Sequence, residues 1–197
     1  MPVSFSIAHN SQGNHNSELG YKWTHSFDIY LVIDAGTGNA SVHWGNDLSY
    51  QFTKNVNGSF SPPTGIHDGL VYNSGTSTYT LTTPGQVQYA FTQVSSQWVC
   101  GTITDRSSNV LTINHNGSGY VSSVVDASSR TLSFSYDGNN RITSVTDPAS
   151  RSFSFSYSSG ELVQVTYPAV GGTSPTLQFG YNANHDITSE TDPRGKV

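Results

Sequence analysis

The side chains of this chain that could perform chemistry are its Ser and Asp residues and its seven His residues. Together, Ser, His and Asp can build a hydrolytic triad, in which His accepts the proton of a Ser nucleophile and Asp orients the His ring. The sequence contains no Gly-x-Ser-x-Gly segment, and no window predicts the helix that follows such a nucleophile. We therefore predict no catalytic residue and no enzymatic activity.

The sequence predicts neither a metal site nor a cofactor. His9 and His15 flank a Gly/Asn-rich loop, which is not the close spacing of zinc ligands. Asp105 and Asp126 each lack a second acidic residue in their segment, whereas calcium requires six or more oxygen ligands. Cys100 is the single cysteine, so an intrachain disulfide and a zinc site built from cysteines are both excluded. Its neighbours Trp98 and Val99 indicate a small buried side chain.

Composition limits the possible partners. Charged residues make up 11% of the chain, its net charge is -5, and its 8 Lys and Arg residues do not cluster, so a nucleic-acid partner is not predicted. No apolar run is long enough to span a bilayer, and the segment MPVSFSIAHN lacks the features of a signal peptide, so membrane insertion is not expected. The abundance of Ser, Thr, Asn, Gly and Tyr is typical of β proteins outside the cytosol. We expect a secreted or cell-surface protein.

Strand patterns extend along the whole chain, and helix patterns are nearly absent. Turn clusters rich in Gly, Asn, Ser and Pro separate short apolar or alternating segments, which predicts antiparallel strands joined by short turns. The clearest predicted strands are residues 3–9, 27–33, 49–54, 78–83 and 87–94.

A repeat occupies the second half of the chain. Asp105, Asp126 and Asp147 recur at a constant interval, since 126 − 105 and 147 − 126 both equal 21. The same interval separates the ring-bearing residues His115, Tyr136 and Tyr157, and also Asn109, Arg130 and Arg151. Three independent series with one period indicate a repeat array. A longer fourth copy ends at Tyr181, and Asp192 opens a fifth.

One repeat unit reads as a β-hairpin. Leu132, Phe134 and Tyr136 alternate with polar residues, which predicts a half-buried strand before the turn segment DGNN. In the return strand, Ile142 and Val145 are three residues apart, as are the corresponding apolar residues of the neighbouring copies. Because strict alternation breaks at the same place in every copy, we predict a recurrent bulge or bend that curves the sheet.

The segment FSYDGNNRITSVTDPASR resembles the tyrosine-aspartate (YD) repeat of bacterial Rhs proteins, toxin-complex C components and animal teneurins. The matching positions are Tyr136, Asp137, Arg141, Ile142, Asp147, Pro148 and Arg151. Other copies depart from the pattern, since His115 replaces the Tyr, and Ser158 and Asn182 replace the Asp. The segment LGYKWTHSFD at residues 19–28 is similar to a segment that precedes the repeats in many Rhs cores.

The resemblance covers essentially the whole chain and implies a pre-repeat β region over residues 1–100 and YD repeats over residues 101–197. It implies an all-β fold in which stacked hairpins form a strip of spiralling antiparallel sheet. In full-length bacterial relatives such a strip is part of a hollow shell around a polypeptide cargo. The partners implied are the rest of the shell and a toxin polypeptide. Because the chain stops where a strand should begin, we expect a piece of a longer protein that self-associates through open sheet edges.

A second hypothesis is a β domain that binds a glycan or a cell surface. An exposed Trp beside polar side chains can stack on a sugar, and the candidate residues are Trp23 with His25, Trp44 and Trp98, together with Tyr50. Trp in a β protein is more often a core residue, which we favour for Trp23.

Overall fold

The computed structural model describes residues 3–196, and these residues form 20 strands and no helix, so no helix among them could cross a membrane. The N-terminal strands are β1 (Ile7–His9), β2 (Asn16–Ser17), β3 (Gly20–Tyr21), β4 (Trp23–His25), β5 (Tyr30–Ile33), β6 (Ala40–His43), β7 (Ser49–Lys54), β8 (Phe60–Ser61), β9 (Gly69–Asn73), β10 (Thr78–Thr82) and β11 (Gln88–Val94). The remaining strands are β12 (Gln97–Thr104), β13 (Val110–His115), β14 (Val121–Val125), β15 (Thr131–Tyr136), β16 (Ile142–Thr146), β17 (Ser152–Ser158), β18 (Glu161–Thr166), β19 (Thr176–Tyr181) and β20 (Ile187–Thr191).

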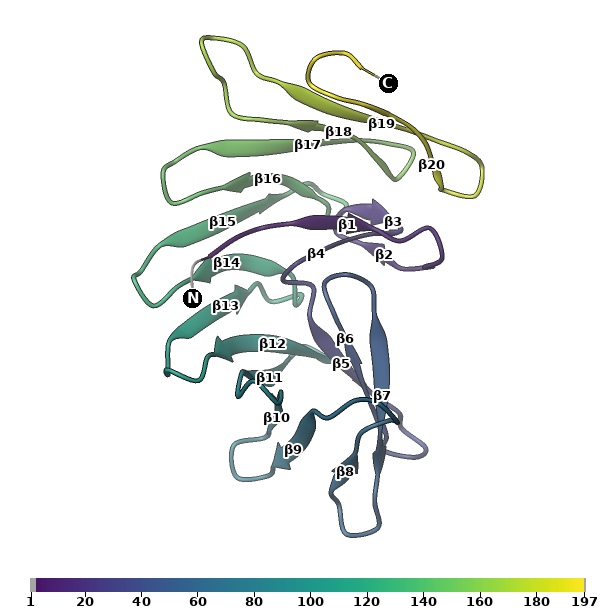
Figure 1. The fold of residues 1–197 in the computed structure, drawn as a ribbon, viewed down its shortest axis with the longest axis vertical. Coiled ribbons are helices and arrows are strands. Elements are labelled where there is room, and N and C mark those ends of the chain that lie inside the picture. The colour runs from purple at the N-terminus through teal and green to yellow at the C-terminus, as the bar shows by residue number, and fades with distance from the viewer. Residues whose placement is uncertain (1–2, 197) are drawn as a thin grey trace.

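Most strands belong to one 16-stranded sheet in which each described pair is antiparallel. From β12 to β20 the strands follow each other in chain order, as consecutive hairpins (Figure 1). This order confirms the predicted fold of an all-β chain built from stacked hairpins. The predicted strand at residues 49–54 coincides with β7, and those at 78–83 and 87–94 match β10 and β11 to within one residue at each end.

The sheet branches at β12. Val99 of β12 is aligned with Thr92 of β11 and, on the other edge, with Tyr30 of β5, while the C-terminal half of β12 pairs with β13. Through β5 the sheet continues to β6, β7 and β8, whereas through β11 it continues to β10 and β9. β12 therefore connects the repeat hairpins to both groups of earlier strands.

Each repeat hairpin contains a register shift at the same place. In β15 and β16, Ser135 is aligned with Ser144 but Tyr136 with Ile142, so Thr143 has no aligned partner. The same shift occurs at Asn114/His115, Ser156/Tyr157 and Gly180/Tyr181. The extra residue places Ile142 and Val145 on one buried face although they are three residues apart, which confirms the predicted bulge.

The N-terminal segment, residues 3–29, crosses the apolar face of the repeat sheet (Figure 1). β1 pairs with β4, and β2 pairs with β3, so this layer consists of two small hairpin sheets. The ring of Phe5 packs edge-on against Phe134 at a centroid distance of 5.5 Å, and Trp23 packs against Phe179 at 4.9 Å. The core therefore lies between these hairpins and the inner face of the sheet.

Candidate functional site

The aspartates of the repeat region sit at the turns. Asp147 Oδ1 accepts the backbone N–H groups of Ala149 and Arg151, each at 2.9 Å, and Asp147 Oδ2 accepts Nε of Arg151 at 2.7 Å. Ser150, between them, has a φ of 61° and adopts the left-handed conformation that the turn requires. The same arrangement of one side-chain oxygen and two N–H groups recurs at Asp105, Asn116, Asp126, Asp137, Asn182 and Asp192.

These hydrogen bonds favour the ionised carboxylate. The hydrogen bonds from the side chain and the backbone of Arg151 hold the pKa of Asp147 below its usual range. Arg130 pairs with Asp126 and Arg141 with Asp137 in the same way, both at 2.7 Å. The repeated Asp and Arg residues thus neutralise each other within one turn, an arrangement that stabilises the hairpin ends.

The repeated tyrosines connect one hairpin to the previous one. The hydroxyl of Tyr136 donates to the carbonyl of Val121 at 2.7 Å, and that of Tyr157 donates to Ile142 at 2.7 Å. Tyr181 donates to Leu162 in the same way, at 2.6 Å, and accepts Nε1 of Trp23 at 2.8 Å. Burial raises the pKa of Tyr181 to about 12, so the hydroxyl keeps its proton.

These carbonyls need a donor because they lie beyond the end of the ladder to the next hairpin. The β16–β17 ladder extends only from Ser144 to Thr146, so Ile142 has no aligned residue in β17. Its N–H instead donates to the carbonyl of Glu18 at 2.8 Å, and its carbonyl accepts the hydroxyl of Tyr157. The tyrosine of each repeat therefore satisfies a backbone group that lies beyond the end of the ladder.

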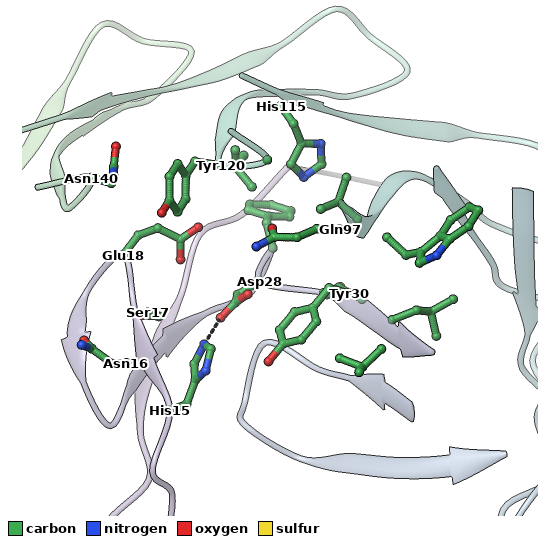
Figure 2. A pocket seen from close by; sticks show the side chains of 18 of the residues that line it. His15, Asn16, Ser17, Glu18, Asp28, Tyr30, Gln97, His115, Tyr120 and Asn140 are labelled. Atoms are coloured by element: carbon green, nitrogen blue, oxygen red, sulfur yellow. Dashed lines mark hydrogen bonds and ion pairs between the residues drawn. The ribbon is translucent and has the colours of Figure 1, made fainter. Parts of the chain in front are cut away.

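A pocket of about 800 Å³ lies between the N-terminal segment and strands β5 and β12–β14 (Figure 2). His15 Nε2 lies 3.0 Å from Asp28 Oδ2, and the hydroxyl of Thr24 donates to the same oxygen at 3.0 Å. The hydrogen bond to Asp28 raises the pKa of His15. Burial is the largest single influence on Asp28 and opposes its ionisation, but the hydrogen bonds from His15 and Thr24 and the neighbouring histidine rings together outweigh it, so the pKa of Asp28 is lowered.

A second His and a second carboxylate lie next to the first pair. His25 is fully buried, its Nδ1 accepts the backbone N–H of Phe27 at 3.3 Å, and its Nε2 is 3.7 Å from Glu18 Oε2. The bond from Phe27 requires an unprotonated Nδ1, so in the neutral ring the proton is on Nε2 and is directed toward Glu18.

The other walls of the pocket are aromatic rings and side-chain amides. Figure 2 shows Gln97 between Tyr120 and Tyr30, and Asn140 beyond Tyr120 at the left of the view. The hydroxyl of Ser17, which is also labelled in Figure 2, accepts the backbone N–H of Leu19 at 3.0 Å, and no described contact joins it to His15 or His25. The arrangement can hold a polar ligand by hydrogen bonds and ring contacts.

The structure corrects the surface-binding hypothesis for two of its residues. Trp23 is 5% exposed and His25 is fully buried, because the N-terminal hairpins pack onto the repeat sheet at these positions, so neither presents a ring face to solvent. Trp44 and Trp98 are half-buried and pack edge-on against Tyr89 and Tyr79 at 5.0 and 4.9 Å. Among these candidates only Trp98 lines the pocket.

Sequence reasoning missed most residues of the pocket. Asp28 and Glu18 carry no motif, and His15 was weighed only as a metal ligand beside His9. In the structure, His9 packs against Trp23 instead, at a centroid distance of 5.2 Å. Within residues 3–196, no group of three or more His, Cys, Asp or Glu side chains is arranged to hold a metal ion.

Comparison with known proteins gives two family matches. The model of the RHS Repeat matches residues 115–152 and 136–173, and these two windows begin one 21-residue period apart, since 136 − 115 equals 21. The model of a domain of unknown function (DUF6531) matches residues 1–52. No curated protein matches the chain.

Among solved structures, the chain is similar to one chain of the structure titled "Crystal Structure of TcdB2-TccC3-Cdc42". The two chains are 12% identical, with a TM-score of 0.43. The match covers 88% of this chain but only 12% of the other chain, so the sequence corresponds in length to a small part of that protein.

Proposed function

Since the chain belongs to the Rhs/YD-repeat family, we propose that it is a non-catalytic structural strip of a shell wall. In a longer polypeptide, this strip would enclose or display a toxin or another effector outside the bacterial cytosol. Its partners are the remaining shell and the enclosed polypeptide, without nucleic acid or cofactor. The edge of β20 that does not pair with β19 is the site at which copies self-associate.

The observation that carries this proposal is the way one hairpin is joined to the next. The ladder, the bulge and the tyrosine contact recur in successive copies, so a further hairpin adds to the sheet without altering those before it. Such a design suits a wall of variable length. It provides a curved wall over the enclosed polypeptide, and it places the repeated polar side chains in turns instead of in an active site.

Protease protection tests the enclosing role. A longer natural polypeptide that contains this strip is digested with a nonspecific protease, with and without mild denaturant. We expect the effector segment to resist cleavage until the shell unfolds, and then to be cleaved rapidly. Cleavage of the effector segment in the native protein at the rate of the isolated, unfolded segment would contradict the proposal.

The pocket supports a second candidate function, the binding of a neutral sugar. Tyr120 and Trp98 contribute aromatic rings to the lining, and Gln97 and Asp28 offer the hydrogen-bonding groups that sugar hydroxyls require. Glycan-array screening of the wild-type chain and of a Gln97→Ala variant tests this role. Specific binding that is lost in the variant, with an unchanged thermal melt, supports it, and the absence of any bound glycan excludes it.

A further inference from the structure

A second pocket, of about 590 Å³, lies on the apolar face of the repeat sheet beside β1. Residues 3–7 line it together with the turn at Pro148 and Ala149 and with the charged residues Arg130, Asp147 and Arg151. The floor consists of inward-facing side chains from β15 to β18 and the residue after β18, namely Leu132, Val145, Phe153, Phe155, Val165 and Tyr167. We refer to this pocket as the β1 groove.

The edge of β1 that is not paired with β4 has free backbone groups. Ser26 N–H donates to the carbonyl of Ser6, and Asn10 N–H donates to the carbonyl of Lys22, both at 2.9 Å. In an antiparallel pair the N–H and C=O groups of successive residues point to opposite edges. The N–H and C=O groups of the even-numbered residues therefore face β4, and those of Phe5 and Ile7 face away from it.

No other described strand covers this edge. Among residues 3–196, β4 is the only strand that pairs with β1, and no described backbone group bonds to Phe5 or Ile7 on the opposite edge. Figure 1 shows β4 on one side of β1 and the ribbons of β16 and β17 on the other side. The free edge thus borders the groove that residues 3–7 line.

The floor of the groove is less completely covered than the rest of the core. Phe155 and Val165 are buried, but Phe153 and Tyr167, which pack edge-on at a centroid distance of 5.8 Å, are only half-buried. Phe5, on the adjacent strand, already contacts this layer, since its ring lies 6.2 Å from that of Phe155. A strand placed beside β1 would be about 4.8 Å from it and would cover the two half-buried rings.

We propose that the β1 groove binds an extended segment of a partner polypeptide, which adds to the free edge of β1 as a third strand. Main-chain hydrogen bonds to Phe5 and Ile7 hold the segment, and every second side chain is apolar because it points to the floor. Continuity with the β1–β4 sheet requires an extended occupant. The free strand that a second copy would offer at the repeat end of its sheet is β20, and its sequence ITSET has one apolar side chain and therefore lacks the alternation that the floor requires, so we assign the groove to a partner and not to a second copy.

Strand addition is independent of the shell role, because it needs only β1 and the floor of the groove. The probe is a fluorophore-labelled synthetic peptide in which Val and Phe alternate with Thr between terminal Lys residues. Its anisotropy is measured with the whole chain, and hydrogen exchange of the backbone amides is measured by NMR. We expect saturable binding, and exchange at Phe5 and Ile7 that slows by roughly tenfold or more.

Two controls separate strand addition from nonspecific adhesion. A peptide with the same side chains, N-methylated on the amides that would face β1, cannot form the ladder and should not bind. The Phe153→Thr variant removes a ring from the floor and should weaken binding at least about tenfold, which corresponds to 1.4 kcal/mol. The Ser154→Ala variant alters the opposite face of the same strand and should bind as the wild type does, and thermal melts confirm that both variants fold.

Several results would overturn the assignment. Equal binding of the N-methylated peptide would mean that the groove attracts apolar side chains without a ladder. Protection of β20 amides in place of Phe5 and Ile7 would move the site to another edge, and the absence of saturable binding would remove it. Protection of Phe5 and Ile7 in a dimer without peptide would identify a second copy as the occupant.

Discussion

Replacing Tyr157 with Phe removes one hydroxyl and leaves the ring in place. That hydroxyl donates to the carbonyl of Ile142 at 2.7 Å and lies 3.3 Å from the carbonyl of Glu18. It therefore joins two consecutive repeats and also contacts the N-terminal segment. If the tyrosine serves to satisfy the carbonyl that lies beyond the end of the ladder, the Tyr157→Phe variant must lose stability.

The magnitude follows from what the variant leaves behind. The net value of an ordinary hydrogen bond is about 0.5–1.5 kcal/mol, but a buried acceptor without a donor costs about 1–3 kcal/mol. Because the β16–β17 ladder has ended at Ile142, its carbonyl has no second donor in β17. We expect the free energy of unfolding to fall by about 1–3 kcal/mol.

The matched control is Tyr120→Phe. Tyr120 is also half-buried and lies beside Tyr136, but no described side chain or backbone group bonds to its hydroxyl. Its replacement should change stability by less than about 0.5 kcal/mol. Urea unfolding followed by Trp fluorescence measures both variants, with equal slopes as the test of two-state behaviour. If Tyr157→Phe and Tyr120→Phe are equally stable, the tyrosine contact does not hold the repeats together.

Three further outcomes test the packing, the close contacts and the turns. Phe134→Ala should lower the free energy of unfolding by about 3–5 kcal/mol, and Ser135→Ala, on the outer face of the same strand, should leave it nearly unchanged; a loss below about 1 kcal/mol for Phe134→Ala in a reversible melt would mean that the face is open to solvent. Gly45→Ala would bring a methyl group into overlap with a backbone carbonyl of the N-terminal segment, so urea unfolding should show a loss of about 1–3 kcal/mol, whereas Gly138→Ala, with open space around it, should show none. Because the folded-state pKa of Asp147 is lowered, its contribution to stability is complete above the unfolded pKa of about 3.9 and is lost as the pH falls through the folded value. The free energy of unfolding, measured at a series of acidic pH values, should therefore fall less for Asp147→Asn than for the wild type. Parallel curves for the two proteins would count against the turn hydrogen bonds.

The sequence was sufficient to predict the repeat hairpins because their determinants are local. Alternation at Leu132 and Phe134 and the turn residues after Tyr136 specify two strands and their reversal. The three-residue spacing of Ile142 and Val145 also located the bulge, since only an extra residue returns the second side chain to the same face.

The placement of the N-terminal segment could not be predicted in the same way. The pairing of β5 with β12 joins Tyr30 to Val99, residues that are remote in sequence, and no local pattern specifies such a partner. The packing of Phe5 on Phe134 was open for the same reason, because the sequence allowed either these strands or another copy to cover the aromatic face.

The pocket and the role of the tyrosines were missed for a related physical reason. His15 and Asp28 meet because two short hairpins fold back on each other, and neither residue lies in a motif. The tyrosine pattern was evident, but the acceptor of its hydroxyl depends on where the ladder of the previous repeat ends. That boundary is a property of the assembled sheet and cannot be read from one repeat.

The cover supplied by residues 3–29 favours self-association through sheet edges over association face to face. Because this segment occupies much of the apolar face, association face to face would require it to be displaced, and sheet edges are the easier route. The sheet has three terminal strands: β8 has only two residues, Phe60 and Ser61, and is followed directly by Pro62 and Pro63, which interrupt further pairing, whereas β9 has five residues and pairs only with β10 among residues 3–196. β20 has five residues and pairs only with β19 among residues 3–196. We therefore expect copies to associate through the five-residue terminal strands, β20 and β9, and not through β8.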